Sequence, residues 1–341
     1  MNQIHLQGRY NLESNRDKPL EFWANFGWVV LGLVLLYFGA EWLVKGSAEI
    51  AIKFGISPLV VGLTVVAFGT SAPELLVCLQ ANFQGKGDLA IGNIVGSNIC
   101  NIAMVLGASA IIYPLKIHQQ IFKREMIILV VVSLVFVGMI FGGTLSQVEG
   151  VLLFIGIIAY VILSVLQARR APASDLDETL SPEEVEAVLS GGNKRLLINI
   201  GLILLGILLL FIGSDRLVYG AEAIANSLGV PEAIIALSLV AFGTSLPELA
   251  TGVMASWRKQ GDIVVGNAVG SCIFNLLAVG GLTAALQPVT TTQLNWIDLA
   301  VMIGTAVIGW VMMRSNRSIS RFEGTIMLAA YLGYCFYLTT R

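Results

Sequence analysis

Residues 67–107 read AFGTSAPELLVCLQANFQGKGDLAIGNIVGSNICNIAMVLG, and residues 241–281 read AFGTSLPELATGVMASWRKQGDIVVGNAVGSCIFNLLAVGG. The two stretches lie 174 positions apart, and 20 of their 41 aligned residues are identical. The shared residues include a Thr-Ser pair, a Pro-Glu pair, an Asp and a Gly-Asn…Gly-Ser…Asn run, which are not generic apolar filler. The duplication predicts a chain built from two homologous halves.

The composition indicates a membrane protein. The chain is 56% hydrophobic and 12% charged, with a mean hydropathy of +0.81, whereas a soluble domain carries about twice that charged fraction. Runs of roughly 18 or more apolar residues mark spanning helices, and we expect ten of them, near 26–45, 57–81, 89–113, 125–142, 148–168, 195–214, 232–256, 262–286, 296–314 and 322–340. Such long runs exclude a β-barrel, which needs alternating segments of about ten residues.

The two halves divide the chain into recognisable parts. We expect an N-terminal extracytoplasmic tail, a first five-helix repeat, an acidic cytoplasmic loop and a second five-helix repeat, at residues 1–25, 26–169, 170–194 and 195–341. Because five is odd, the second half enters the membrane from the opposite side. The predicted fold is therefore an all-α integral membrane protein with ten transmembrane helices in two inverted five-helix repeats, an architecture that places a substrate site near the midplane.

The charges predict an orientation. If both termini share one side, 14 of the 20 Lys and Arg residues fall in connections on the other side, and the positive-inside rule then places both termini outside the cytoplasm. Residues 1–25 lack the apolar stretch and cleavage site of a signal peptide. The acidic loop lacks the spaced Asp/Asn/Gly pattern of a calcium hand, so we interpret it as a solvated linker. Asp88 and Asp262 open their spans and are expected to be helix N-caps.

The hexapeptides Gly69–Glu74 and Gly243–Glu248 predict broken helices. Each lies in the middle of a span, where proline removes a backbone donor and frees a carbonyl one turn earlier. Irregular backbone at membrane depth is tolerated only where it is buried in protein or lines a cavity. These segments therefore offer the carbonyl oxygens and helix ends from which transporters build ion sites.

Glu74 and Glu248 follow the breaks at equivalent positions. A charge at the bilayer centre costs at least about 2.5–3.5 kcal/mol on insertion scales, so each must face a polar partner. A protonated glutamic acid in a simple helix–helix hydrogen bond is the structural alternative. The duplication and the neighbouring Thr and Ser residues favour a functional site instead.

The third element supplies hydroxyl and amide groups. Ser97 and Asn101 are four residues apart and so share one helical face, and Ser271 and Asn275 repeat this spacing. The glycine pairs of these segments allow close helix approach. Together the groups form an all-oxygen site, which suits Ca²⁺, Mg²⁺ and Na⁺ rather than zinc or copper. Magnesium needs a small octahedron and dehydrates reluctantly, so calcium or sodium is favoured.

GTSAPE with GNIVGSN, and GTSLPE with GNAVGSC, resemble the signature repeats of the sodium/calcium exchanger (cation/calcium antiporter) family, in particular its compact prokaryotic members. The resemblance covers nearly the whole chain after residue 25. It implies a prokaryotic inner (plasma) membrane protein with cation sites between the second, third, seventh and eighth spans. The implied metal ligands are Glu74, Glu248, Thr70, Ser71, Thr244, Ser245, Ser97, Asn101, Ser271 and Asn275, with the carbonyls of Ala67 and Ala241 at flanking sodium sites.

The resemblance also implies a mechanism, in which the first and sixth spans slide across the other eight as a gate. Several relatives, notably the potassium-dependent branch, carry Asp at the position of Asn275, so its Asn argues against potassium co-transport and against proton coupling at that position. The expected function is Ca²⁺ exchange for Na⁺, without a cofactor beyond these transported ions, by a chain taken as a monomer in the lipid bilayer with no nucleic-acid partner.

Three alternatives remain open. A Ca²⁺/H⁺ antiporter uses the same fold, and Glu74 or Glu248 can exchange protons. An intramembrane enzyme would use this pair of carboxyl groups as acid and base, although no catalytic motif accompanies them. A channel would show ion flux without a counter-ion and with much faster turnover.

Overall fold

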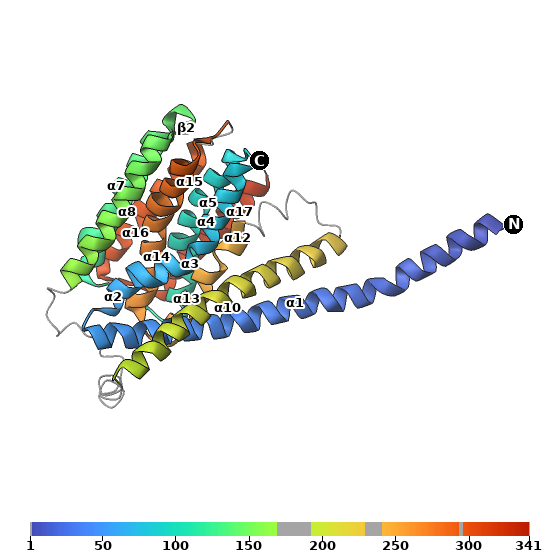
Figure 1. Ribbon diagram of the computed structural model, residues 1–341, viewed down its shortest axis with the longest axis horizontal. Helices are drawn as coiled ribbons and strands as arrows, with labels where there is room; N and C mark the ends of the chain where they lie inside the picture. Colours follow the sequence, from blue (N-terminus) through green and yellow to red (C-terminus); the bar gives the residue numbers. More distant parts are fainter. Residues whose placement is uncertain (1, 169–191, 229–240, 293–295, 341) are drawn as a thin grey trace.

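The computed structural model describes residues 2–168, 192–228, 241–292 and 296–340, with side chains from Phe22 onward. The described chain is mostly helical (Figure 1), and the label η marks π-helical and 3₁₀ segments. The first half contains α1 (Asn2–Phe54), α2 (Pro58–Val61), η1 (Gly62–Val66), α3 (Ala67–Thr70), α4 (Ala72–Phe83), α5 (Gly87–Cys100), η2 (Asn101–Val105), α6 (Leu106–Ile112), η3 (Ile121–Glu125), α7 (Met126–Met139), η4 (Ile140–Gly142) and α8 (Gln147–Ala168).

The second half repeats this order where it is described. It contains α10 (Gly192–Ser227), α12 (Ala241–Thr244), α13 (Leu246–Trp257), α14 (Gly261–Phe274), η7 (Asn275–Val279), α15 (Gly280–Leu286), α16 (Trp296–Asn316) and α17 (Arg321–Thr339). The π-helical turns η2 and η7 begin at Asn101 and Asn275, which are equivalent positions of the two halves. Of the expected acidic loop 170–194, only residues 192–194 lie within the described residues.

Several of these helices are long and apolar enough to cross a membrane. Within the described residues there are seven, or eight if the bent pair Pro58–Thr70 and Ala72–Phe83 forms one span. The expected span near 232–256 begins outside the described residues, and the one near 322–340 corresponds to α17. The architecture is that of a multi-pass helical membrane protein.

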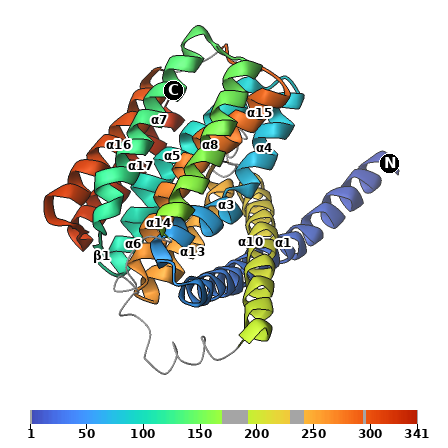
Figure 2. The ribbon, with the colours of Figure 1, turned by 60° about the vertical axis from the view of Figure 1, so that its left-hand side comes forward.

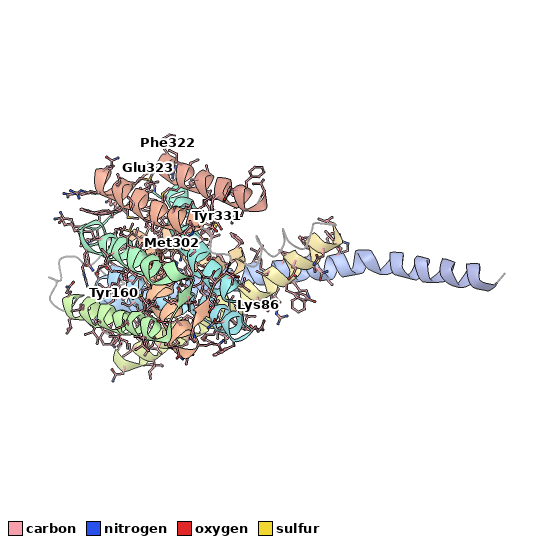
Figure 3. All side chains as sticks on the ribbon, turned by 90° about the horizontal axis from the view of Figure 1, so that it is seen from above. Lys86, Tyr160, Met302, Phe322, Glu323 and Tyr331 are labelled. Carbon is pink, nitrogen blue, oxygen red and sulfur yellow. The ribbon has the colours of Figure 1, made fainter. Side chains whose placement is uncertain are left out.

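Helices α1 and α10 form a distinct pair. Helix α1 starts at Asn2, so the residues expected as a tail continue the helix of the first span. Its apolar part, Phe22–Phe54, has 33 residues and a length of about 50 Å, which exceeds the roughly 30 Å hydrocarbon layer and requires a tilt. Both helices cross the bundle obliquely (Figure 2), and Figure 3 shows α1 projecting far beyond it.

Glycines set the distance between α1 and α10. A Cβ atom added to Gly39 would lie 2.8 Å from the backbone nitrogen of Leu210, and one added to Gly206 would lie 2.8 Å from the carbonyl oxygen of Gly39. Real Cβ atoms do not approach backbone atoms so closely, so only glycine fits at both positions. The two helices make the most extensive contact of any pair of described elements.

Helices α5 and α14 occupy the centre of the bundle. Buried residues make up 83% of the span that contains α5 and 94% of the span that contains α14, compared with 28% in the span of α8. Gly266 of α14 approaches Gly62 of η1, where a Cβ atom on either residue would lie 3.2 Å from the other's Cα atom. The expected close helix approach is thus found in the second repeat. The equivalent partner of Gly92 and Gly96 falls within residues 229–240, outside the described part.

Two short ladders join the halves at opposite ends of the bundle. Strand β1 (Leu115–Lys116) pairs antiparallel with β4 (Ser318–Ile319), and β2 (Thr144–Leu145) pairs antiparallel with β3 (Val289–Thr290). Beyond the ladders, the Ile117 N–H donates to the Arg317 carbonyl at 2.9 Å and the Thr291 N–H donates to the Gly143 carbonyl at 2.8 Å. Each contact is the repeat-related copy of the other, so both ends of the bundle are tied across the two halves.

The expected N-cap role of Asp88 and Asp262 is wrong. Both residues lie in the first turn of their helices, and the N-cap positions belong to Lys86 and Gln260. The Asp88 carboxylate instead accepts hydrogen bonds from Thr292, through its N–H at 3.0 Å and its hydroxyl at 3.1 Å, and from the Thr291 hydroxyl. It therefore fixes the connection that follows β3.

Candidate cation site

The helix breaks occur where the sequence predicts them. Ser71 has φ −85° and ψ 4° between α3 and α4, and Ser245 has φ −91° and ψ 6° between α12 and α13. The helices on the two sides of Ser71 are bent by 41°. Pro73 and Pro247 lie in the first turn of the helices that restart, where a missing N–H costs nothing. Each carboxylate therefore sits in the first turn of a new helix, near its positive dipole end.

The two repeats exchange hydrogen bonds at these breaks. The Ser71 hydroxyl donates to Glu248 Oε1 at 3.2 Å, and the Ser245 hydroxyl donates to Glu74 Oε1 at 3.5 Å. Both glutamates are 0% exposed. Because each serine reaches the carboxylate of the other repeat, the two breaks meet and the site belongs to both halves.

The remaining expected hydroxyls close around this centre. Ser97 donates to Glu74 Oε1 at 3.5 Å and lies 3.2 Å from the Ser245 hydroxyl. The hydroxyls of Thr70 and Ser271 lie 3.3 Å apart and face the carboxylate of Glu248. Helices α3, α5 and α14 and the two helix breaks thus contribute hydroxyl groups to one buried cluster.

Two asparagines that were not among the expected ligands, Asn267 and Asn93, accept hydrogen bonds from the threonines. Thr70 donates to Asn267 Oδ1 at 3.1 Å, and Thr244 donates to Asn93 Oδ1 at 3.1 Å. The Asn267 amide in turn donates to the Thr251 hydroxyl at 3.0 Å. Both asparagines are the Asn of the duplicated Gly-Asn pair, so their identity in both repeats was the signal available in the sequence.

Several buried polar atoms of the expected ligands have no hydrogen-bond partner. Among the described residues, Glu74 Oε2, Glu248 Oε2 and both side-chain amide atoms of Asn101 and Asn275 are buried and unpaired. An unsatisfied buried polar group costs about 1–3 kcal/mol, and more when it is charged. These orphaned atoms occur as equivalent pairs in the two repeats, which indicates a site shaped for something that supplies the missing interactions.

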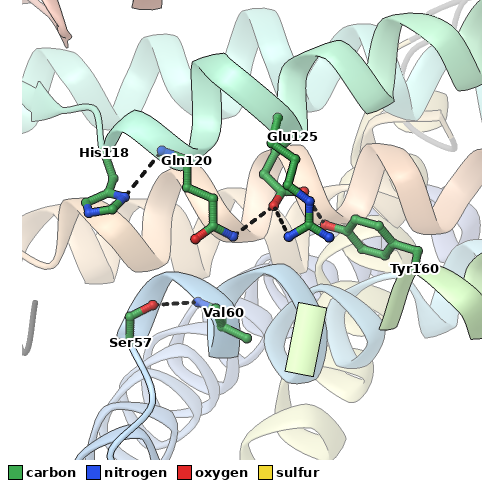
Figure 4. A network of polar contacts seen from close by, with 7 residues as sticks. Ser57, Val60, His118, Gln120, Glu125 and Tyr160 are labelled. Carbon is green, nitrogen blue, oxygen red and sulfur yellow. Dashed lines mark hydrogen bonds and ion pairs between the residues drawn. The ribbon is translucent and has the colours of Figure 1, made fainter. Parts of the chain in front are cut away.

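A third buried carboxylate shows the contrast. Glu125 is also 0% exposed, but it accepts hydrogen bonds from the Tyr160 hydroxyl and the Gln120 amide, both at 2.9 Å, and pairs with Arg124 at 3.3 Å (Figure 4). No Lys or Arg of the described residues forms an ion pair with Glu74 or Glu248. The central carboxylates thus lack the compensation that a structural buried carboxylate receives.

The donor set matches a hard cation. Within the described residues, no three His, Cys, Asp or Glu side chains converge; the converging groups are two carboxylates with hydroxyl and amide oxygens. Such oxygens suit Ca²⁺ and Na⁺. Two carboxylates carry the charge that balances one divalent cation. Calcium accepts irregular arrangements of different oxygen ligands, so this mixed set of oxygens suits it.

The expected carbonyl ligands have unequal surroundings. The Ala67 carbonyl accepts from the Ser71 N–H at 3.0 Å and from the Thr70 hydroxyl at 3.4 Å. In the second repeat, the Ser245 N–H donates instead to the Phe242 carbonyl at 3.2 Å. Helix α12 begins at Ala241, whose side chain lies outside the described part. The ligand roles of Ala67 and Ala241 stay predictions.

Comparisons with known proteins place these features in context. A family model described as sodium/calcium exchanger protein matches the chain twice, at residues 24–166 and 198–340, which are 174 positions apart. The putative antiporter CaxA of Alkalimonas amylolytica is 36% identical over 314 residues, covering 91% of this chain and 97% of CaxA. The sodium/calcium exchanger MaX1 of Methanosarcina acetivorans is 31% identical, covering 91% of this chain and 97% of its own.

A solved structure has a similar fold. A structure of the sodium–calcium exchanger NCX_Mj, soaked with Na⁺ and Sr²⁺, has a TM-score of 0.77 and 31% identity, covering 90% of this chain and 96% of that one. A more distant relative, the Ca²⁺/H⁺ antiporter ChaA of Bacillus subtilis, is 24% identical, covering 84% of this chain and 85% of ChaA.

Proposed function

This chain belongs to the sodium/calcium exchanger protein family, and from that premise we propose that it exchanges Ca²⁺ for Na⁺ across a prokaryotic inner membrane by alternating access to a midplane all-oxygen site. It is a membrane transporter of the cation/calcium antiporter kind and not an enzyme. The intramembrane enzyme considered from the sequence is therefore set aside.

The observation that carries the proposal is the pair of uncompensated carboxylates. Glu74 and Glu248 are fully buried, each has one unpaired oxygen, and no Lys or Arg of the described residues pairs with them. Two buried negative charges without a partner are expensive, so the site is stable only when cations or protons occupy it. Ca²⁺ and Na⁺ then compete for the same oxygens, which is the requirement for exchange.

The proposed topology is ten transmembrane helices in two inverted five-helix repeats, with both termini extracytoplasmic. Three observations support it. The family model matches twice with an offset of 174, the ladders β1–β4 and β2–β3 are copies of one another, and the Lys and Arg residues favour one side. Residues 170–194 are then a cytoplasmic loop between the repeats.

Helices α1 and α10 are the proposed moving part. They contact each other more extensively than any other pair of described elements, and glycines such as Gly39 and Gly206 make their common interface narrow. In this proposal the pair slides along the remaining helices and opens the site to one side at a time. The pair carries no carboxylate of the central site.

The proposal is tested with ⁴⁵Ca²⁺ uptake into proteoliposomes, with outward Na⁺, H⁺ and K⁺ gradients applied separately. We expect uptake to follow the Na⁺ gradient and to be abolished by Glu74→Gln or Glu248→Gln. Asp215→Asn is the matched control, because Asp215 is 60% exposed and, among the described residues, its ion pair is with its neighbour Arg216. Uptake that ignores the Na⁺ gradient contradicts sodium coupling.

Ca²⁺/H⁺ exchange is the second candidate. It is favoured by the same two carboxylates, which are chemically able to carry protons, and by the similarity to ChaA. In this case an outward proton gradient drives uptake without sodium. Asn101 and Asn275 leave the central site without a third and a fourth carboxylate, so we expect no response to a K⁺ gradient.

A further inference from the structure

A charged pocket lies where the C-terminal part of α1 meets the N-terminal part of α10. Its volume is about 280 Å³, and its polar lining comes from Lys45 and Glu49 of α1 and from Lys194, Arg195 and Asn199 of α10. None of these residues belongs to the candidate cation site. The pocket is therefore a separate feature of the α1–α10 pair.

The walls of the pocket are fixed by helix geometry. Lys45 and Glu49 are four residues apart on α1, and Arg195 and Asn199 are four residues apart on α10, so each helix turns one face toward the cavity. A Cβ atom on Gly46 would lie 2.9 Å from the Asn199 carbonyl oxygen. The two backbones thus approach closely at this level, and the pocket does not depend on a mobile loop.

The pocket carries an excess of positive charge. Three basic side chains, Lys45, Lys194 and Arg195, line it together with one carboxylate, Glu49. Arg195 Nε lies 2.9 Å from Glu49 Oε2, so these two charges offset each other. The two lysines remain as the excess. Lys53, one helical turn beyond Glu49, donates to the Gly192 carbonyl at the start of α10 and adds a further positive charge to this end of the pair.

A buried amide donor also faces this region. Asn199 is 1% exposed and lines the pocket, and its Nδ2 makes no hydrogen bond of normal geometry. It interacts more weakly with the Glu49 carboxylate. The pocket thus combines excess positive charge with a poorly satisfied amide donor, and an anionic oxygen would interact favourably with both.

We propose that this pocket binds the phosphate group of an anionic phospholipid. It lies at the ends of two membrane-spanning helices, where lipid headgroups are found, and basic pockets between such helices recognise anionic headgroups. Ile198 and Leu202 continue the α10 wall beyond Lys194 at four-residue steps. They provide an apolar surface for the glycerol and the first acyl carbons, which a free phosphate ion would not use.

A lipid in this pocket contacts both helices of the α1–α10 pair. The phosphate lies between the lysine of α1 and the lysine of α10, which otherwise repel each other. Binding therefore stabilises the pair as one unit.

The test measures binding directly and needs no transport. The full-length protein, purified in a zwitterionic detergent, is titrated with phosphatidylglycerol or phosphatidylcholine, and bound lipids are counted by native mass spectrometry. Lys45→Gln/Lys194→Gln removes the two excess charges, Lys116→Gln/Lys123→Gln is the charge-matched control elsewhere, and Asn199→Leu removes only the amide. We expect one tightly bound phosphatidylglycerol in the wild type and in the control, with affinity about tenfold lower in the pocket double variant.

Each other outcome has a defined meaning. If the control variant loses phosphatidylglycerol binding to the same extent as the pocket double variant, the proposal is wrong, because the attraction is then a general effect of positive charge. Unchanged binding in both pocket variants overturns it as well. If inorganic phosphate raises the unfolding temperature as much as phosphatidylglycerol and displaces it, the ligand is a free anion and the lipid assignment is wrong. Circular dichroism of every variant checks that binding is lost without loss of helical structure.

Discussion

The Ser71 hydroxyl donates a hydrogen bond to Glu248 Oε1 at 3.2 Å, although the two residues are 177 positions apart in the chain. The second repeat returns the contact through Ser245 and Glu74. Each half of the chain therefore completes the polar environment of the carboxylate in the other half. Neither half contains all the groups of the candidate site. A change at one helix break therefore alters the surroundings of both carboxylates.

Removal of either serine hydroxyl should weaken cation binding. We expect Ser71→Ala and Ser245→Ala each to lower the apparent Ca²⁺ affinity by about tenfold, because a hydrogen bond to a charged group is worth about 1.5–3 kcal/mol. The measurement is the Ca²⁺ dependence of ⁴⁵Ca²⁺ uptake. Ser133→Ala is the control, since its buried hydroxyl donates to the Leu129 carbonyl of its own helix at 2.8 Å. Equal effects in all three variants contradict a role of these hydroxyls in the site.

Replacement of the orphaned amides should separate stability from function. We expect Asn101→Leu or Asn275→Leu to raise the stability of the cation-free protein by about 1–3 kcal/mol, because an unsatisfied buried polar group is removed, and to abolish the stabilisation by Ca²⁺. Thermal unfolding in chelator and in Ca²⁺ measures both effects. Asn82→Leu is the control and should destabilise, because the Asn82 amide donates to the Gln287 carbonyl at 2.8 Å. Destabilisation of the cation-free protein by all three variants would show that the amides serve only packing.

The interface of α1 and α10 should have no room for an added methyl group at a glycine position. Gly206→Ala places a Cβ atom 2.8 Å from the Gly39 carbonyl oxygen and 2.8 Å from the Leu43 backbone nitrogen, so we expect a lower unfolding temperature and slower exchange. Gly201→Ala on the same helix meets nothing within 4 Å and should be neutral or stabilising, by up to about 1 kcal/mol. If Gly201→Ala proves as harmful as Gly206→Ala, the close approach is not the cause.

An ion pair links α1 to the turn after α13. Arg258 Nη2 lies 2.6 Å from Glu41 Oε1, and both side chains are about one-third exposed, so the pair is worth about 1 kcal/mol or less. If α1 slides, Arg258→Glu should change the exchange rate and leave the half-saturating Ca²⁺ concentration unchanged. The double variant Glu41→Arg/Arg258→Glu should restore the rate. An effect of Arg258→Glu that the double variant does not reverse argues against the pair.

The sequence predicted the parts of the site that depend on local chemistry. Gly69, Pro73 and their copies interrupt a helix through their own backbone properties, so the breaks at Ser71 and Ser245 were found. The hydrogen bond from Thr70 to Asn267 was missed because Asn267 lies 197 positions away and its orientation depends on tertiary packing. Glu149 and Glu323 each accept hydrogen bonds from the N–H and the hydroxyl of the serine three positions earlier. That capping pattern was readable in the sequence.

The fold was predicted in part. Apolar runs gave most helix positions, because burial in lipid requires continuous hydrogen-bonded backbone. The continuation of α1 to Asn2 was not expected, since residues 1–25 carry polar and charged side chains that a lipid-based criterion excludes. The π-helical turns at Asn101 and Asn275 were also not expected. They depend on a hydrogen-bond register that residue type alone does not specify.

The paired ladders constrain which motions this molecule can make. β1 is joined to β4 at one end of the bundle and β2 to β3 at the other, so the two halves of the chain are connected at both ends. In a rocker-switch movement the two halves tilt apart, first at one end and then at the other. Such a movement would have to break the hydrogen bonds of one ladder in every cycle. Under the proposed function, we therefore expect these connections to persist through the cycle and access to the site to be controlled at the side of the bundle, where α1 and α10 lie.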